Sequence, residues 1–186
     1  MTDAHCEWKT VSELVANQDE RGIEQLLALH RARLRRMVSA RLDPRLAVRV
    51  DPSDVVQETL MEAVRKLPDY LREQPLPVYP WLRKIAAHRI ANLAARHISA
   101  QKRSVSREDH WELGLSDGSV AQLANAFVEP GDSPSRQLMR RELISQVRLA
   151  LARLPYMDRE VLILQFVEQM SPKETSAAMG ISPEAV

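Results

Sequence analysis

The stretch MSPKETSAAMGISPEAV at residues 170–186 carries the same helix-start signal twice. Ser171 and Glu174 form a capping box: a hydroxyl caps the helix, a carboxylate reaches back to the cap, and proline takes the first helical position. Gly180 is the residue expected just past a helix end, because glycine readily adopts the left-handed conformation needed there. Ser182 and the next proline then repeat the start signal. The stretch therefore predicts a helix, a turn of about three residues and the start of a second helix.

The residue types favour helices in the rest of the chain as well. Of 186 residues, 45% are hydrophobic and only 4% are aromatic, with five glycines. No segment shows sustained alternation of apolar and polar residues, which a half-buried strand would require. We therefore expect an all-α fold, and the length is sufficient for one ordinary domain or two small ones, each with its own core.

Several classes of protein do not fit this sequence. No apolar run approaches the roughly eighteen residues of a membrane helix and the N-terminus is polar, so we expect a cytoplasmic protein without membrane insertion. Cys6 is the only cysteine, and with His5 it would give just two metal ligands, so we expect neither a disulfide nor a metal or cofactor site. No glycine-rich phosphate loop or nucleophile motif occurs, so we do not expect an enzyme.

The formal net charge of +1 hides blocks of opposite sign along the chain. Residues 31–49 contain seven arginines against the single acid Asp43. Residues 51–62 contain four acids and no base, and residues 74–107 contain seven bases and no acid. Charges sorted in this way favour surfaces for different partners: one acidic contact and at least one contact for a polyanion.

Hydrophobic periodicity divides the chain into two groups of helices. We expect an N-terminal segment over 1–21, a first domain over 22–99, a linker over 100–135 with a short helix, and a second domain over 136–186. The first domain should contain helices over 22–42, 52–67 and 81–97, and the second should contain helices over 136–154, 158–170 and 172–180. Residues 68–80 hold four prolines and predict an irregular loop.

Two helix faces carry polar residues at helical spacing. Asp54, Glu58 and Glu62 recur every four residues and share one face of their helix. A second stripe, on the next helix, consists of Trp81, Lys84, His88, Asn92 and Arg96. The first face suits a basic partner, and the second combines bases with an aromatic, as a nucleic-acid surface does.

Three stretches then resemble one known family. DPSDVVQETLMEAVRKLPDY, YPWLRKIAAHRIANLAARHISAQKR and LARLPYMDREVLILQFVEQMSPKETSAAMGISPEAV occur in order and at family-like distances. They resemble bacterial RNA polymerase sigma factors of the extracytoplasmic-function (ECF) type. The first two correspond to the sigma-2 domain and the third to the sigma-4 domain, so the resemblance covers most of residues 22–99 and 136–186.

The resemblance implies a core polymerase-binding face made of Asp54, Gln57 and Glu58. In the family this face docks on the coiled-coil clamp helices of the largest polymerase subunit. A face of acids suits a basic helical partner, because surface charges steer association and set the register of docking. Acids that merely cap a helix would explain Asp54, but they would not explain Glu58 deeper in the helix.

The basic helix that starts near Trp81 would then meet the minus-ten promoter element. Lys84, Arg89 and Arg96 are the phosphate candidates, and Asn92 is placed to read a base edge. Trp81 either stacks on an unpaired base or belongs to the core, and His88 is expected as a surface contact. Residues 68–80 would form the loop that captures a flipped base.

The helix-turn-helix would read the minus-thirty-five element, with Lys173, Ser182 and Glu184 as candidate DNA contacts. The family continues after the position of Val186 with a basic recognition helix, so we expect a sigma-4 domain that lacks most of that helix. Without its partner, the preceding helix should leave Leu164 or Phe166 partly exposed.

Two other functions remain open from the sequence. A stand-alone helix-turn-helix regulator would bind duplex DNA without polymerase, but it would have no use for the acidic face. A helical adaptor would bind only protein, but the acid-free stretch 74–107 argues against it. Under the sigma-factor reading, the expected partners are core RNA polymerase, promoter DNA and an anti-sigma factor.

Overall fold

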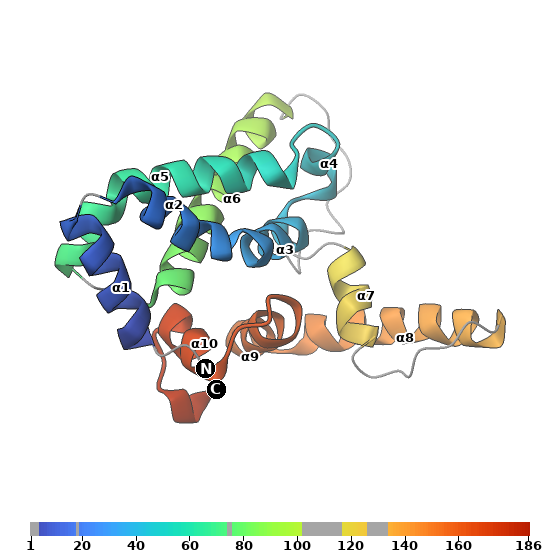
Figure 1. Ribbon diagram of the computed structural model, residues 1–186. Coiled ribbons are helices and arrows are strands. Elements are labelled where there is room, and N and C mark those ends of the chain that lie inside the picture. The colour runs from blue at the N-terminus through green and yellow to red at the C-terminus, as the bar shows by residue number, and fades with distance from the viewer. Residues whose placement is uncertain (1–3, 18, 74–75, 102–116, 126–133) are drawn as a thin grey trace.

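The computed structural model describes residues 4–17, 19–73, 76–101, 117–125 and 134–186 (Figure 1). Every regular element in these stretches is helical, so the predicted all-α class is confirmed. No helix among the described residues is long and apolar enough to cross a membrane. Much of the predicted linker lies outside the described residues, as do residues 74–75 of the segment predicted as a loop.

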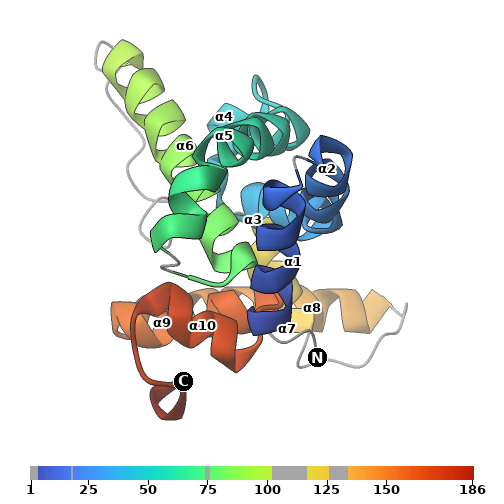
Figure 2. The ribbon, with the colours of Figure 1, turned by 60° about the vertical axis from the view of Figure 1, so that its left-hand side comes forward.

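The helices form two groups. The N-terminal unit contains α1 (Ala4–Ala16), α2 (Glu20–Leu29), α3 (Arg31–Arg41), α4 (Pro44–Ala47), α5 (Pro52–Glu73) and α6 (Val78–Gln101). After α7 (Asp117–Asn125), the C-terminal unit contains α8 (Pro134–Arg153), α9 (Tyr156–Leu162), the π-helical turn η1 (Ile163–Val167), α10 (Pro172–Met179) and the 3-10 turn η2 (Pro183–Ala185). Figures 1 and 2 show α8, α9 and α10 along one side of the α1–α6 bundle.

The single helix predicted over 22–42 is two helices with a break at His30. The His30 amide donates to the carbonyl of Leu27, three residues back, and this tight turn ends α2. The His30 side chain is buried, with its ring centroid 5.9 Å from that of Tyr79. Hydrophobic periodicity runs unchanged through the break because both helices bury the same side, so the sequence does not reveal it.

The predicted loop over 68–80 is wrong for most of its length. Helix α5 continues through Pro68 to Glu73, and α6 begins at Val78. Proline removes only one helical hydrogen bond, and the apolar face continues beyond it with Tyr70, which is buried. Pro80 lies in the first turn of α6, where a missing amide donor has no cost. Packing on both sides of the prolines therefore outweighs the helix-breaking signal.

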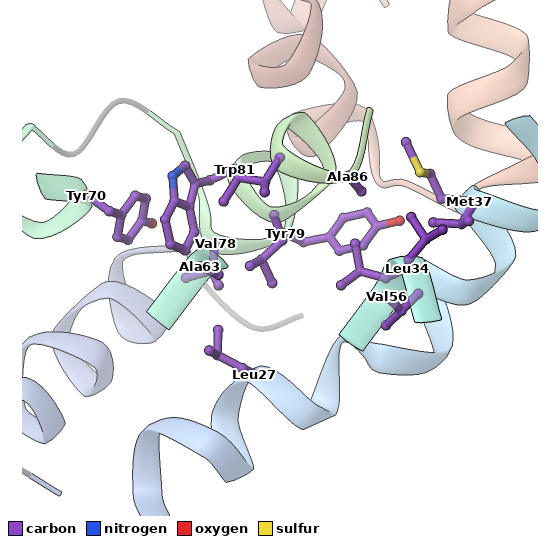
Figure 3. Packing of buried hydrophobic residues seen from close by; sticks show 14 of the residues in the cluster. Leu27, Leu34, Met37, Val56, Ala63, Tyr70, Val78, Tyr79, Trp81 and Ala86 are labelled. Carbon is purple, nitrogen blue, oxygen red and sulfur yellow. The ribbon is translucent and has the colours of Figure 1, made fainter. Parts of the chain in front are cut away.

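The core of the N-terminal unit lies between α3, α5 and α6. Leu34 and Met37 from α3, Val56 from α5 and Tyr79 from α6 are almost fully buried there (Figure 3). Leu82 from α6 is also fully buried in this core. These positions repeat at three- and four-residue spacing in each helix, which is the pattern expected of helices that pack along one face.

The C-terminal unit packs against this core. Leu164 and Met170 belong to the same buried cluster as the residues of α3, α5 and α6. The expectation of a partly exposed side chain is therefore wrong for Leu164, which is 1% exposed, and confirmed for Phe166, which is 44% exposed. The reason is that the N-terminal unit covers the apolar face of η1, and a contact between segments so distant in the chain leaves no local pattern.

Helix α7 lies in the predicted linker and packs against α8 and η1. Its buried Leu123 joins Ala40, Leu151, Ile163 and Val167 in a second, smaller apolar cluster. The Ser119 hydroxyl donates to the backbone carbonyl of Ala40 at 3.3 Å. This short helix therefore connects α3 of the N-terminal unit with the C-terminal unit.

We predict that Leu164→Ala lowers the free energy of unfolding by about 2–5 kcal/mol, because it leaves a cavity in the shared core. Phe166→Ala on the same turn is the matched control and should change it by less than about 1 kcal/mol. Urea unfolding followed by circular dichroism measures both values. Equal effects of the two variants would show that the C-terminal unit does not pack on the N-terminal core.

Candidate functional site

The predicted acidic face lies exposed on the first turns of α5. Asp51 accepts a hydrogen bond from the Ser53 amide at 2.7 Å, just ahead of the helix, and Pro52 takes the first position. Asp54, Gln57 and Glu58 follow with exposed side chains. A carboxylate near a helix N-terminus is favoured by the helix dipole, which explains how α5 carries acids there without loss of stability. The three residues therefore share one accessible patch.

An ion-pair cluster links this patch to α6. Arg89 Nη2 donates to Glu58 Oε2 at 2.8 Å, and Arg89 Nη1 donates to Glu62 Oε2 at 3.1 Å. Lys66 Nζ lies 2.7 Å from the other oxygen of Glu62. The hydrogen bond from Lys66 and the charge of Arg89 hold the pKa of Glu62 below its usual range. Arg89, expected as a phosphate contact, is thus bound to the acidic face. Both charge patterns are visible in the sequence, but their pairing across two helices is not.

The remaining basic and polar residues of α6 form an exposed stripe. Lys84, His88, Asn92 and Arg96 are all exposed, at the spacing of three or four residues that places them on one side of the helix. Asn92 Nδ2 lies 3.3 Å from His88 Nδ1, so these two side chains hold each other in place. The stripe offers cations for phosphates and an amide for a base edge.

Trp81 belongs to the core, which is one of the two roles open from the sequence. It is 7% exposed, and its ring stacks on Tyr70 with centroids 4.3 Å apart (Figure 3). The Tyr70 hydroxyl donates to the Leu76 carbonyl at 2.8 Å, which fixes the pair against the start of α6. A stacked ring pair of this kind stabilises the junction between α5 and α6.

A groove of about 410 Å³ runs beside this ring pair. Trp81 and Tyr70 form part of its wall, while Lys84 and His88 from the exposed stripe form another part. Acids of α5 such as Glu62 and Asp69 line the other side. The groove combines an aromatic edge, hydrogen-bonding groups and a cation, which is the chemistry that holds an unstacked base.

The first helix-start signal holds in the structure, whereas the second opens only the three-residue 3-10 turn η2. The Ser171 hydroxyl accepts from the Glu174 amide, the Glu174 carboxylate accepts from the Ser171 amide, and Gly180 is left-handed with φ 67°. Lys173, in the first turn of α10, is exposed, as are Ser182 and Glu184 on either side of Pro183. Backbone and Ser182 hydrogen bonds lower the pKa of Glu184, so it is a carboxylate near neutral pH and repels phosphate.

No group of three or more His, Cys, Asp or Glu that could hold a metal ion occurs in the part of the chain that the structure describes. What the described residues offer is binding chemistry: an acidic patch, a basic stripe and a groove, all on α5 and α6.

The structure predicts different outcomes for two neighbours on α6. Trp81→Ala should lower the free energy of unfolding by about 3–5 kcal/mol because it empties the core beside Tyr70. Lys84→Gln should leave the free energy of unfolding within about 0.5 kcal/mol but weaken binding to single-stranded DNA and reduce its salt slope by about one unit. Fluorescence anisotropy over a salt series measures the second effect, and an unchanged slope would remove Lys84 from the interface.

Comparisons with known proteins point to one family. Residues 144–186 match the family model described as Sigma-70, region 4. The ECF RNA polymerase sigma factor SigD of Mycobacterium bovis is 28% identical over 176 residues, which cover 95% of this chain and 74% of SigD. The RNA polymerase sigma factor CnrH of Cupriavidus metallidurans is 29% identical over 171 residues, which cover 92% of this chain and 82% of CnrH. No solved structure matches the chain.

Proposed function

Because this chain belongs to the ECF RNA polymerase sigma factors, which direct transcription initiation, we propose that α5 docks it on core RNA polymerase and that α6 contacts promoter DNA. The observation that carries the proposal is the arrangement on α5 and α6: an exposed acidic patch and an exposed basic stripe lie on two helices packed against each other. The match to two sigma factors along most of the chain supports it.

The polymerase contact is proposed for Asp54, Gln57 and Glu58. Asp54 and Gln57 are exposed and have no ion pair in the described structure. Glu58 is shared with Arg89, and its side chain is still 61% exposed. Exposed ion pairs contribute little to stability, so a basic partner helix can compete for this carboxylate at small cost. The patch would steer the approach of a basic surface on polymerase and set its register.

The DNA contact is proposed for the stripe and the groove beside it. Lys84 and Arg96 would neutralise phosphates along α6, and Asn92 would hydrogen-bond a base edge. A base freed by melting would enter the groove between Lys84, His88 and the edge of Trp81. In this arrangement Arg89 positions α6 against α5, and Trp81 shapes the groove from the core.

The C-terminal unit is proposed to read the upstream promoter element with its helix-turn-helix. Lys173 and Ser182 have the chemistry for phosphate contacts, whereas the carboxylate of Glu184 suits hydrogen bonding to cytosine N4 rather than a phosphate. We also propose that the chain is held inactive by a protein partner of the anti-sigma kind, as the family resemblance implies.

We predict that Asp54→Lys weakens binding to core polymerase by at least about tenfold, because it places a cation where a basic partner docks. Among the described residues, no partner forms a hydrogen bond with the Asp54 side chain. Asp54 is therefore a cleaner site than Glu58, where a lysine would face Arg89. Binding is measured as the apparent Kd for fluorescently labelled core polymerase and checked by co-elution on gel filtration.

The matched control is Glu24→Lys, an identical charge change at an exposed residue of α2. It should leave the apparent Kd within about twofold of the unmodified chain, so any larger loss in Asp54→Lys reports the site rather than net charge. A folded chain that never binds core polymerase but binds duplex DNA alone would instead identify a stand-alone helix-turn-helix regulator.

A further inference from the structure

The seven arginines of the block 31–49 divide into two groups in the structure. Arg33, Arg41 and Arg45 bind carboxylates at 2.8 or 2.9 Å. The other four are exposed and form no ion pair within the part of the chain that the structure describes: Arg31, Arg35, Arg36 and Arg49. All of these except Arg49 line one groove, which we call the arginine groove. The fold therefore gathers unpaired cations in one place.

The arginine groove has the size and shape of a small-molecule site. It lies between α3, α5 and α7, and Gln57 of α5 and Gln122 of α7 line it together with the arginines of α3. The Ser119 hydroxyl donates to the Ala40 carbonyl at 3.3 Å, which holds α7 against the end of α3 (Figure 1). The volume is about 1020 Å³, at the upper end of the range of roughly 300–1,000 Å³ that is typical of ligand pockets.

Helical spacing fixes the three cations on the groove side of α3. Arg31 and Arg35 are four residues apart, and Arg36 follows directly. Leu34 and Met37 of the same helix are fully buried in the core of the N-terminal unit. Because these two residues set the rotation of α3 about its axis, the arginine face cannot turn away from the groove.

The positive charge of the arginine groove has no counter-charge inside it. None of the described residues that line the groove is acidic. The carboxylate that Arg35 influences, Asp51, lies outside the lining: hydrogen bonds from Ser53 lower its pKa most, and the charge of Arg35 lowers it further. Like charges one helical turn apart, such as Arg31 and Arg35, repel each other. An anion bound in the groove would relieve this repulsion.

The chemistry of the lining favours an anion that also carries a flat ring. A guanidinium donates two parallel hydrogen bonds to a phosphate, so three of them suit a run of phosphates. The floor beside them is made of small apolar side chains, such as Ala28, Ala32 and Val56. A ring can lie on such a floor, while the amides of Gln57 and Gln122 offer donors and acceptors for its edge.

A strand of nucleic acid suits the arginine groove less well. Sites for single strands combine cations along a track with aromatic side chains on which successive bases stack. No aromatic side chain occurs among the described residues that line this groove, and its cations all come from two turns of one helix. The lining therefore matches one ring with its own phosphates better than a chain of nucleotides.

We propose that the arginine groove binds a nucleoside di- or triphosphate, with Arg31, Arg35 and Arg36 on the phosphates and the base on the apolar floor. A bound nucleotide would occupy the space beside Gln57, a residue of the proposed polymerase contact, and would compete with core polymerase. This competition rests on the proposed function, whereas nucleotide binding by the chain alone does not.

Isothermal titration calorimetry with ATP and with GTP, in the absence of polymerase, tests the site. At least one of the two should bind, and Arg36→Gln should weaken the tighter one by at least about tenfold, because a charge-assisted contact is lost. Arg49→Gln is the matched control, since it removes the same charge from the same arginine block outside the groove. It should change the Kd by less than about twofold.

Two results of this titration would overturn the site. The first is the failure of both nucleotides to bind to the unmodified chain. The second is an equal loss of affinity in Arg36→Gln and Arg49→Gln, because the chain would then attract polyanions through its general charge rather than through the arginine groove.

Inorganic triphosphate separates a nucleotide site from a site for phosphate alone. It should bind at least about fivefold more weakly than the nucleotide, because it leaves the apolar floor uncovered. Ala32 is exposed, so Ala32→Leu fills part of the floor without disturbing the core. This variant should weaken the nucleotide by about fivefold and leave inorganic triphosphate within about twofold. Equal affinities for the two ligands, or a nucleotide affinity unchanged by Ala32→Leu, would contradict the assignment of a base to the floor.

Competition with core polymerase is measured as the apparent Kd of the labelled chain with and without nucleotide. Nucleotide at ten times its own Kd should raise the apparent Kd about elevenfold, and only about twofold in Arg36→Gln. Polymerase binds nucleotides itself, so an increase of equal size in both chains would come from polymerase and would overturn the competition. If the chain binds no polymerase, the proposed function fails, and the calorimetry still decides whether the groove holds a nucleotide.

Discussion

The carboxylate of Glu168 is the constraint on which the arrangement of the helices depends. A charged group with no exposed surface must be neutralised nearby, and its partners come from α3 and α6 of the N-terminal unit. Arg41 and Arg83 can reach the same carboxylate only when these two helices lie side by side and η1 is set against them. The apolar contacts of Leu164 and Met170 follow from this placement, since both residues flank Glu168 along the chain.

A second set of charges joins the two proposed binding surfaces. Arg89 on α6 forms ion pairs with Glu58 and Glu62 on α5, and these pairs bridge the acidic patch and the basic stripe. Tyr70 and Trp81 also stack at the junction of the same helices, so aromatic packing and ion pairs both join the two surfaces. A polymerase docked on α5, as proposed, would therefore influence where α6 meets DNA.

Features whose causes lie within a few residues could be predicted from the sequence. The capping box of Ser171 and Glu174 and the left-handed Gly180 agree with the structure. The extent of α5 and the break at His30 could not be predicted. The helix-breaking signal at Pro68 and the unbroken periodicity through His30 are both local. The packing of α5 on α6 decides the outcome at Pro68, and the packing of His30 against Tyr79 decides it at His30.

The sequence by itself determined the helical class, the chemistry of each helix face and the family resemblance, because these follow from residue type and spacing. Only the tertiary structure decided which basic side chains form ion pairs and which stay exposed. Arg31 and Arg33 are two residues apart in the same basic block, yet Arg31 is exposed while Arg33 binds Glu174. The same holds for the neighbours Arg83 and Lys84, because Arg83 binds Glu168 whereas the Lys84 side chain is exposed to solvent. The glutamates that bind Arg33 and Arg83 lie more than eighty residues away in the chain, and only folding brings such charges within hydrogen-bond distance.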